Sequence, residues 1–306
     1  MFSKITKRLR DLLCESASRR VADSVAFDQM RINQGLLLAS LNQSKQSANI
    51  QDFEFKIFSQ WGEDGIIQKL IQSIEIQNKT FIEFGVETFA ESNCRFLMMK
   101  DNWAGHVIDG SKDNIKTIRT NHYFWKYQLT AREAFITAEN VNELLAESGF
   151  DKDIGILSID IDGVDYWLLK ALNYYKPRIL ILEYNAVFGD QRKISVPYDA
   201  LFDRTTKHSS NLYFGASLAA MTELAVVLGY RFVGTTSSGV NAFYVRGDLV
   251  CDVLEPMAAT AHFTMSKTRE ARDHLGALNF VAGEDRVTLI RGMAVINTET
   301  GKSEKL

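Results

Sequence analysis

The chain has 306 residues, of which 46% are hydrophobic and 24% are charged, proportions that suit one sizeable globular α/β domain with appendages. Its formal net charge of -3 excludes an overall basic field that would recruit nucleic acid. The three cysteines, Cys14, Cys94 and Cys251, are too far apart for a zinc site with closely spaced ligands. No apolar run is long enough to span a membrane. These features predict a cytoplasmic protein with no nucleic-acid partner.

The first 50 residues are predicted to be helical, because apolar residues recur at spacings near three to four with basic residues between them. The pattern includes Phe2, Ile5, Leu9 and Leu12, with Lys4, Lys7, Arg8 and Arg10 interspersed. One interpretation is an amphipathic helix that packs on its own domain or on a second subunit of a homo-oligomer. The other is a basic helix that lies on an anionic membrane, at the inner membrane face.

From residue 80 onward, short apolar strands alternate with helices. The predicted strands are 80–86, 105–111, one segment within 123–136, 154–162, 178–185, 230–235 and 240–245, and the predicted helices include 96–99, 112–120, 141–145, 166–172 and 216–228. Residues 186–214 read as a long polar loop, and the polar tail contains a predicted helix near 267–277. Repeated strand–helix units predict a Rossmann-like, doubly wound, mostly parallel sheet, and the last two strands predict an antiparallel hairpin at its edge. We expect three parts: an N-terminal helical extension (1–50), the main α/β domain (51–250) and a C-terminal extension (251–306).

The loop after the first of these strands is a candidate cofactor site. Glu83 and Gly85 end the strand, and Ser92 and Asn93 follow in the loop. A glycine there lets a ligand approach the backbone closely, whereas a dinucleotide fold is disfavoured because no G-x-G-x-x-G motif is present. The alternative is a tight turn between strand and helix.

Asp109 and Gly110 end the next strand, roughly twenty residues further on, which is the spacing of a nucleoside-binding βαβ unit. The carboxylate of Asp109 could accept hydrogen bonds from both hydroxyls of a ribose. The alternative is an Asx-turn.

The densest acidic cluster follows the strand at 154–162. Asp160 and Asp162 lie near its carboxyl end, and Glu183 and Asn185 lie near the end of the next strand. Adjacent parallel strands would bring these oxygen-bearing side chains together, where they could hold Mg²⁺ or another hard divalent cation. Such an ion could lower the pKa of a substrate hydroxyl, and Asp160 is a candidate catalytic residue. The alternative is a polar rim of helix-capping acids.

Two segments near this rim add further candidates. His208, in the long loop, could take a proton from an acceptor hydroxyl, or it could simply be solvated. Residues 58–65 precede the first strand and could fold over the cofactor, with Gln60 and Glu63 as polar contacts. In the alternative, this segment caps a helix through Ser59 or Asp64.

Together these motifs resemble the FkbM-like class I methyltransferases. The segments FSQWGEDGII, FIEFGVETFAESN, HVIDGS, LSIDIDGVDYWLLKAL and ILILEYN carry the resemblance, which covers roughly residues 55 to 246. It implies S-adenosylmethionine as cofactor and methyl transfer to an oxygen of a sugar, a glycan or another polyhydroxylated acceptor. Glu83, Gly85 and Asp109 would then bind the cofactor. Asp160, Glu183 and Asn185 would stand where metal-dependent O-methyltransferases hold their ion.

Two other functions fit parts of the sequence. Asp160-Ile-Asp162-Gly163 after an apolar strand resembles the nucleophile motif of haloacid-dehalogenase-type phosphatases, in which the first aspartate attacks phosphorus. A non-catalytic binding or scaffold protein with a methyltransferase-like fold is the second alternative, since the later glycines of the cofactor loop are missing.

Overall fold

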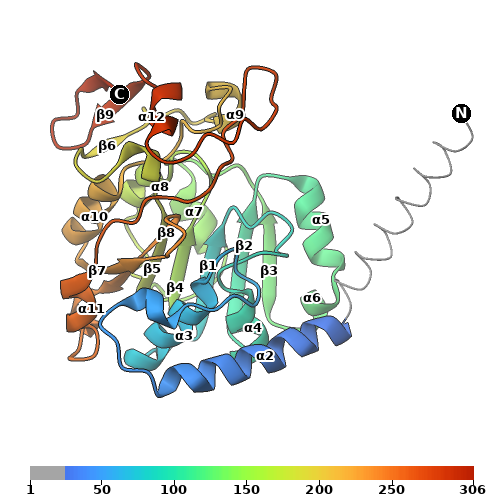
Figure 1. The fold of residues 1–306 in the computed structure, drawn as a ribbon. Coiled ribbons are helices and arrows are strands. Elements are labelled where there is room, and N and C mark those ends of the chain that lie inside the picture. Colours follow the sequence, from blue (N-terminus) through green and yellow to red (C-terminus); the bar gives the residue numbers. More distant parts are fainter. Residues whose placement is uncertain (1–24) are drawn as a thin grey trace, which may run out of the picture.

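A seven-stranded sheet with the order β3–β2–β1–β4–β5–β8–β7 forms the centre of the computed structural model, which describes residues 25–306 (Figure 1). Its strands are β1 (Thr80–Phe84), β2 (Ala104–Asp109), β3 (Leu129–Glu133), β4 (Ile156–Ile159), β5 (Ile179–Glu183), β7 (Tyr230–Thr235) and β8 (Asn241–Arg246). β1 to β5 are parallel, while β8 runs antiparallel to both β5 and β7. The predicted Rossmann-like sheet and its edge hairpin are confirmed.

Helices cover both faces of the sheet, because successive strand residues point to opposite sides and both sides are apolar. In β1, Phe81 belongs to one hydrophobic core and Ile82 to the other. The Ile82 face is covered by α7 (Val141–Ala146), α8 (Asp165–Ala171) and α10 (Leu218–Val227). The Phe81 face is covered by α2 (Val25–Gln43), α3 (Glu63–Ser73), α4 (Arg95–Asp101), α5 (Lys112–Thr120), α6 (His122–Lys126) and α11 (Glu255–Thr260).

The C-terminal segment crosses above the carboxyl ends of the strands (Figure 1). It contains α12 (Asp285–Leu289), β9 (Ala294–Asn297) and β10 (Ser303–Lys305), and β9 pairs with β6 (Ile194–Ser195). The predicted loop 186–214 therefore contains β6, the 3₁₀ turn η2 (Ala186–Phe188) and the short helix α9 (Arg204–Lys207). The predicted helix near 267–277 is wrong. The Asp273 carboxylate accepts the backbone N–H groups of Leu275 and Ala277 instead, which competes with helical bonding.

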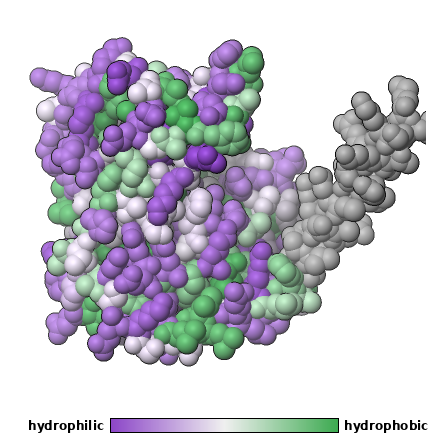
Figure 2. Space-filling view, in the orientation of Figure 1, coloured by the Kyte–Doolittle hydropathy of each residue, from purple (hydrophilic) through white to green (hydrophobic). Residues whose placement is uncertain are grey.

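Helix α2 is fastened to the domain by a buried ion pair between Asp28 and Arg95, 2.7 Å apart. Its other face leaves Met30, Leu37 and Leu41 more than half exposed, and Figure 2 shows hydrophobic residues over this helix. The amphipathic pattern predicted between Phe2 and Leu12 lies outside the described residues. Within residues 25–306, no helix combines the length and apolarity needed to cross a bilayer. The membrane and oligomer interpretations stay predictions.

Candidate active site

The register of the parallel strands brings the ends of β1, β2, β4 and β5 to one edge of the sheet. Phe84 pairs with Ile108, and Ile159 pairs with Leu182. Gly85 and Asp109 therefore lie side by side, as do Asp160 and Glu183. Since the chain runs from β1 to β2 on one side and returns to β4 on the other, this edge is the topological switch point where ligands bind in doubly wound sheets.

Gly85 is required by the closeness of β1 and β4 at this point. Its φ is +71°, a conformation that side chains rarely adopt, and a Cβ built on it would lie 1.7 Å from the carbonyl oxygen of Asp160. The two strand ends thus lie too close together for any side chain at this position.

Glu83 organises the loop that follows β1. Its carboxylate accepts hydrogen bonds from the Ser92 hydroxyl (2.7 Å) and from the backbone N–H groups of Asn93 (2.8 Å) and Cys94 (3.2 Å). The Asn93 amide in turn donates to the hydroxyl of Ser158 on β4. Burial raises the pKa of Glu83 to about 6, and the hydrogen bonds oppose that rise. Glu83, Ser92 and Asn93 line the pocket at this edge of the sheet and also hold the loop in place.

Asp109 is already hydrogen-bonded to the loops beside it. Its carboxylate accepts from the backbone N–H groups of Glu87 (2.7 Å) and Ser111 (2.8 Å) and from the Asn114 amide (3.0 Å). A carboxylate has about four acceptor positions, so about one is left for a ligand. The Asx-turn interpretation and the ligand interpretation are therefore compatible at this residue.

Residues 58–65 in part line the pocket and in part hold their own loop by hydrogen bonds, while Gly62, the N-cap of α3, makes no side-chain cap bond. Gln60 lines the pocket, and so does Trp61, which the sequence interpretation missed and which is 40% exposed. Glu63 is fully buried and does not line the pocket. Its carboxylate accepts the backbone N–H groups of Trp61 and Gly62 and the Asn241 amide. Glu63 is therefore a structural anchor, which corrects its predicted role as a cofactor contact.

Asp64 gives this segment a pH-dependent stability. One carboxylate oxygen accepts three backbone N–H groups and the Ser59 hydroxyl, and the other has no partner. Burial raises its pKa from 3.8 to about 6, against the lowering effect of these hydrogen bonds. Because the folded-state pKa is the higher one, its contribution to stability is fully present below pH 3.8 and is lost as the pH rises through about 6.

Asp64→Asn is therefore expected to lose less stability than wild type between acid and neutral pH. A pKa shift of this size corresponds to a difference of about 3 kcal/mol in the free energy of unfolding across that pH window. Urea unfolding of both proteins at several pH values would measure it. Parallel stability curves for the two proteins would contradict the assignment.

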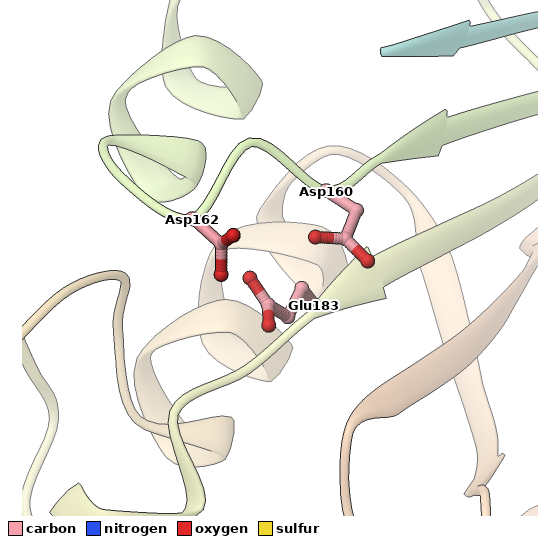
Figure 3. A group of neighbouring side chains, drawn as sticks. All are labelled: Asp160, Asp162 and Glu183. Atoms are coloured by element: carbon pink, nitrogen blue, oxygen red, sulfur yellow. The ribbon is translucent and has the colours of Figure 1, made fainter. Parts of the chain in front are cut away.

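Asp160, Asp162 and Glu183 form the acidic cluster that the sequence predicted. Figure 3 shows the three carboxylates turned toward one another, and one oxygen from each lies within 4.8 Å of the others. Burial, followed by the charges of neighbouring acids, raises the pKa values of Asp160 and Glu183 well above their usual range. Glu183 is buried, and its Oε2 has no hydrogen-bond partner. Carboxylates this close need a shared proton or a cation.

Arg204 on α9 supplies a positive charge to this cluster, and the sequence interpretation did not find it. Its guanidinium forms ion pairs with Asp162 and, at 3.3 Å, with Glu270 of the C-terminal segment. It also lies over the ring of Phe214, 5.0 Å from the centroid. Nothing in the local sequence distinguishes Arg204 from an ordinary loop arginine, since its partners are distant along the chain.

Two predicted site residues have other roles. The Asn185 side chain donates to the carbonyls of Leu212 and Phe214 and accepts the backbone N–H of Val187. Its amide thus fastens the loop to β5, which disfavours it as a metal ligand. His208 does not line the pocket, and its Nδ1 contacts the Ser210 hydroxyl at 2.8 Å. His208 therefore takes part in the hydrogen bonding of its own loop, which corrects its predicted role as a catalytic base.

All these strand ends open into one pocket with a volume of about 450 Å³. Residues of the C-terminal segment and of the β7–β8 turn also line it. In the described part of the chain it is lined by two arginines, Arg204 and Arg286, and by eight acids: Glu83, Glu87, Glu91, Asp109, Asp160, Asp162, Glu183 and Glu270. This excess of carboxylates favours cationic ligands. Without a bound cation it also disfavours the phosphatase alternative, because a phosphate would enter a field of its own sign.

No protein-family model matches the chain, and no curated protein matches it. Solved structures do resemble it. The O-methyltransferase from Bacillus cereus in complex with SAH is 12% identical, with 75% of this chain and 95% of that chain covered and a TM-score of 0.38.

Two further structures have the same kind of likeness. TrmK of M. capricolum in complex with S-adenosyl-homocysteine is 10% identical (64% of this chain, 74% of that chain, TM-score 0.36). Precorrin-6y C5,15-methyltransferase from Geobacter metallireducens is 14% identical (63% and 90%, TM-score 0.34). At these identities and TM-scores the likenesses carry no conclusion about the function of this chain.

Proposed function

We propose that this chain is an S-adenosylmethionine-dependent O-methyltransferase of the FkbM-like kind, acting on a hydroxyl of a sugar, a glycan or a similar polyhydroxylated acceptor. One observation carries the proposal: Gly85, Asp109 and the Asp160 cluster, which are far apart in the sequence, line a single acidic pocket at the switch point of the sheet. Ligand binding at that point is the rule for this architecture.

The cofactor half of the pocket lies over β1 and β2. Gly85 lets a ligand contact the backbone there, and Asp109 has an acceptor position left for a ribose hydroxyl. Phe135 and Ile136 add apolar surface beside Asp109, which suits an aromatic base. The surrounding carboxylates stabilise a positive charge. When bound, S-adenosylmethionine would supply a methyl group on a positively charged sulfur.

The acceptor half lies over β4 and β5. Carboxylates accept hydrogen bonds from hydroxyls, and Asp160, which lines the pocket just after β4, would hold an acceptor hydroxyl and take its proton. The partly exposed ring of Trp61 offers a flat surface at the mouth of the pocket. These features support a polyhydroxylated acceptor.

The acidic cluster also fits a divalent cation. Three carboxylates converge, and one oxygen of the buried Glu183 carboxylate has no hydrogen-bond partner. Oxygen ligands of this kind suit Mg²⁺ or a similar hard ion. When bound, the ion would act as a Lewis acid toward the acceptor hydroxyl. Asp160, Asp162 and Glu183 would hold it, whereas the Asn185 amide is engaged elsewhere.

Calorimetry with S-adenosylhomocysteine tests the cofactor half. We expect binding to the wild-type chain and a roughly tenfold or larger loss in Asp109→Ala, because hydrogen bonds to charged groups are worth about 1.5–3 kcal/mol. Asp113→Ala is the matched control, since Asp113 is an exposed acid of α5 outside the pocket. Thermal unfolding of each variant separates lost affinity from lost structure. A wild-type chain that does not bind S-adenosylhomocysteine would refute the proposal.

Incubation with S-adenosylmethionine and a panel of candidate acceptors would then identify the substrate by the mass gain of one methyl group. Cofactor binding without transfer to any acceptor would instead favour the non-catalytic scaffold alternative.

A further inference from the structure

Arg204 links three segments that are distant in the sequence. It pairs with Asp162 in the loop after β4 and with Glu270 in the C-terminal segment, while it stands on α9 itself. Its side chain is 19% exposed, and the Asp162 side chain is 49% exposed. A single guanidinium thus joins the acidic cluster to the wall of the acceptor half.

The other arginine of the pocket is arranged differently. Arg286 donates to the backbone carbonyls of Ser266, Thr268 and Gly283. Among the ion pairs of the described residues, none joins Arg286 to an acid, and only Arg204 reaches the cluster. Arg204 is therefore the residue that supplies the positive charge which the clustered carboxylates require.

We propose that Arg204 is the resident counter-ion of this cluster, that a divalent cation must displace it from Asp162 to bind, and that Glu270 then holds the displaced guanidinium. The inference rests on the divalent ion of the proposed function. Its physical basis is charge: a guanidinium and a divalent ion on the same carboxylate would place three positive charges within a few ångströms of one another.

The displacement is energetically accessible. This ion pair is weakened by solvent on one side, because the Asp162 side chain is 49% exposed, so Arg204 reduces the affinity of a competing cation by about fivefold. Glu270 favours the displacement because it is already in contact with the same guanidinium and remains available after Asp162 is lost. Cation binding would thus loosen the link between α9 and the loop after β4 without expelling Arg204 from the pocket wall.

Titration of the full chain with Mn²⁺ alone, followed by calorimetry, tests this competition. Arg204→Gln is expected to bind Mn²⁺ about fivefold more tightly than wild type, and Arg204→Lys is expected to stay near wild type because the charge remains. Lys207→Gln is the matched control. It removes the same charge from the same short helix, but Lys207 pairs with Asp199 at 2.6 Å and does not line the pocket. Its Mn²⁺ affinity should not change.

Glu270→Gln provides the decisive comparison. We expect it to weaken Mn²⁺ binding in the wild-type background, because Arg204 loses its alternative partner and holds Asp162 more firmly. In the Arg204→Gln background most of this effect should disappear. If Glu270 acts only through its own charge, the effects of the two substitutions on the free energy of Mn²⁺ binding should add instead.

Additive effects of the two substitutions on Mn²⁺ binding, or unchanged Mn²⁺ affinity in Arg204→Gln, would refute the proposed competition between Arg204 and the cation. If no variant binds Mn²⁺, both the competition and the divalent ion are refuted. S-adenosylhomocysteine binding, measured on the same samples, reports separately on the methyltransferase proposal. Thermal unfolding confirms that each variant is folded.

Discussion

Gly85→Ala is expected to abolish S-adenosylhomocysteine binding and to destabilise the domain by about 2–5 kcal/mol. Two effects combine at this residue. The backbone has a φ of +71°, which costs energy for any residue with a Cβ, and the new methyl group would meet the carbonyl of Asp160 at 1.7 Å. Relief of that contact requires β1 and β4 to move apart, and this movement would separate the two halves of the pocket.

Gly149→Ala separates the two effects. Gly149 follows α7 with a φ of +68°, but a Cβ there would have no atom within 4 Å. We expect it to cost about 1–2 kcal/mol from backbone strain alone and to leave cofactor affinity unchanged. Urea unfolding and calorimetry on both variants measure the difference. If Gly85→Ala binds S-adenosylhomocysteine as well as Gly149→Ala does, the close approach of the strands does not shape the cofactor site.

Asp160→Ala is expected to reduce methyl transfer by about 10²- to 10⁴-fold, the usual contribution of a positioned acid or base. The chain should still fold and bind S-adenosylhomocysteine, because the described hydrogen bonds of Gly85 and Asp109 do not use the Asp160 side chain. Removal of one of three clustered carboxylates also relieves repulsion between like charges, so the variant should be at least as stable as wild type.

The measurement is turnover with the acceptor found in the mass screen, with and without a chelator. Asp151→Ala removes an exposed acid outside the pocket and serves as the control. Undiminished turnover in Asp160→Ala would count against the acidic cluster as the reaction centre. Turnover that survives the chelator would refute the role of the divalent ion but leave the role of Asp160 intact.

The sheet could be predicted because each strand and each helix is encoded locally. The apolar runs ending at Phe84, Asp109 and Glu183 mark buried parallel strands, and α5 occupies the residues predicted for it, Lys112–Thr120. Because parallel strands deliver their carboxyl ends to one edge, placing Gly85, Asp109 and Asp160 in one pocket required only the strand pattern.

The errors fall at loop side chains that the structure engages in hydrogen bonds, with partners both near and far along the chain. Glu63 resembles a loop carboxylate, but Asn241 and two backbone N–H groups hold it inside the protein. His208 resembles a free loop histidine, but it bonds to Ser210 outside the pocket. The C-terminal segment resembles a helix near residue 270, although the Asp273 turn holds it irregular above the sheet.

The sequence by itself thus determined the strands, their mostly parallel arrangement and the acidic residues at their ends, because hydrophobic periodicity and turn residues act over a few neighbouring positions. Only the tertiary structure decided which side chains face the pocket, which are engaged in fastening loops, and that Arg204 and Glu270 reach the acidic cluster. Those outcomes depend on packing and on ion pairs between residues 42 and 66 positions apart, which leave no periodic trace in the chain.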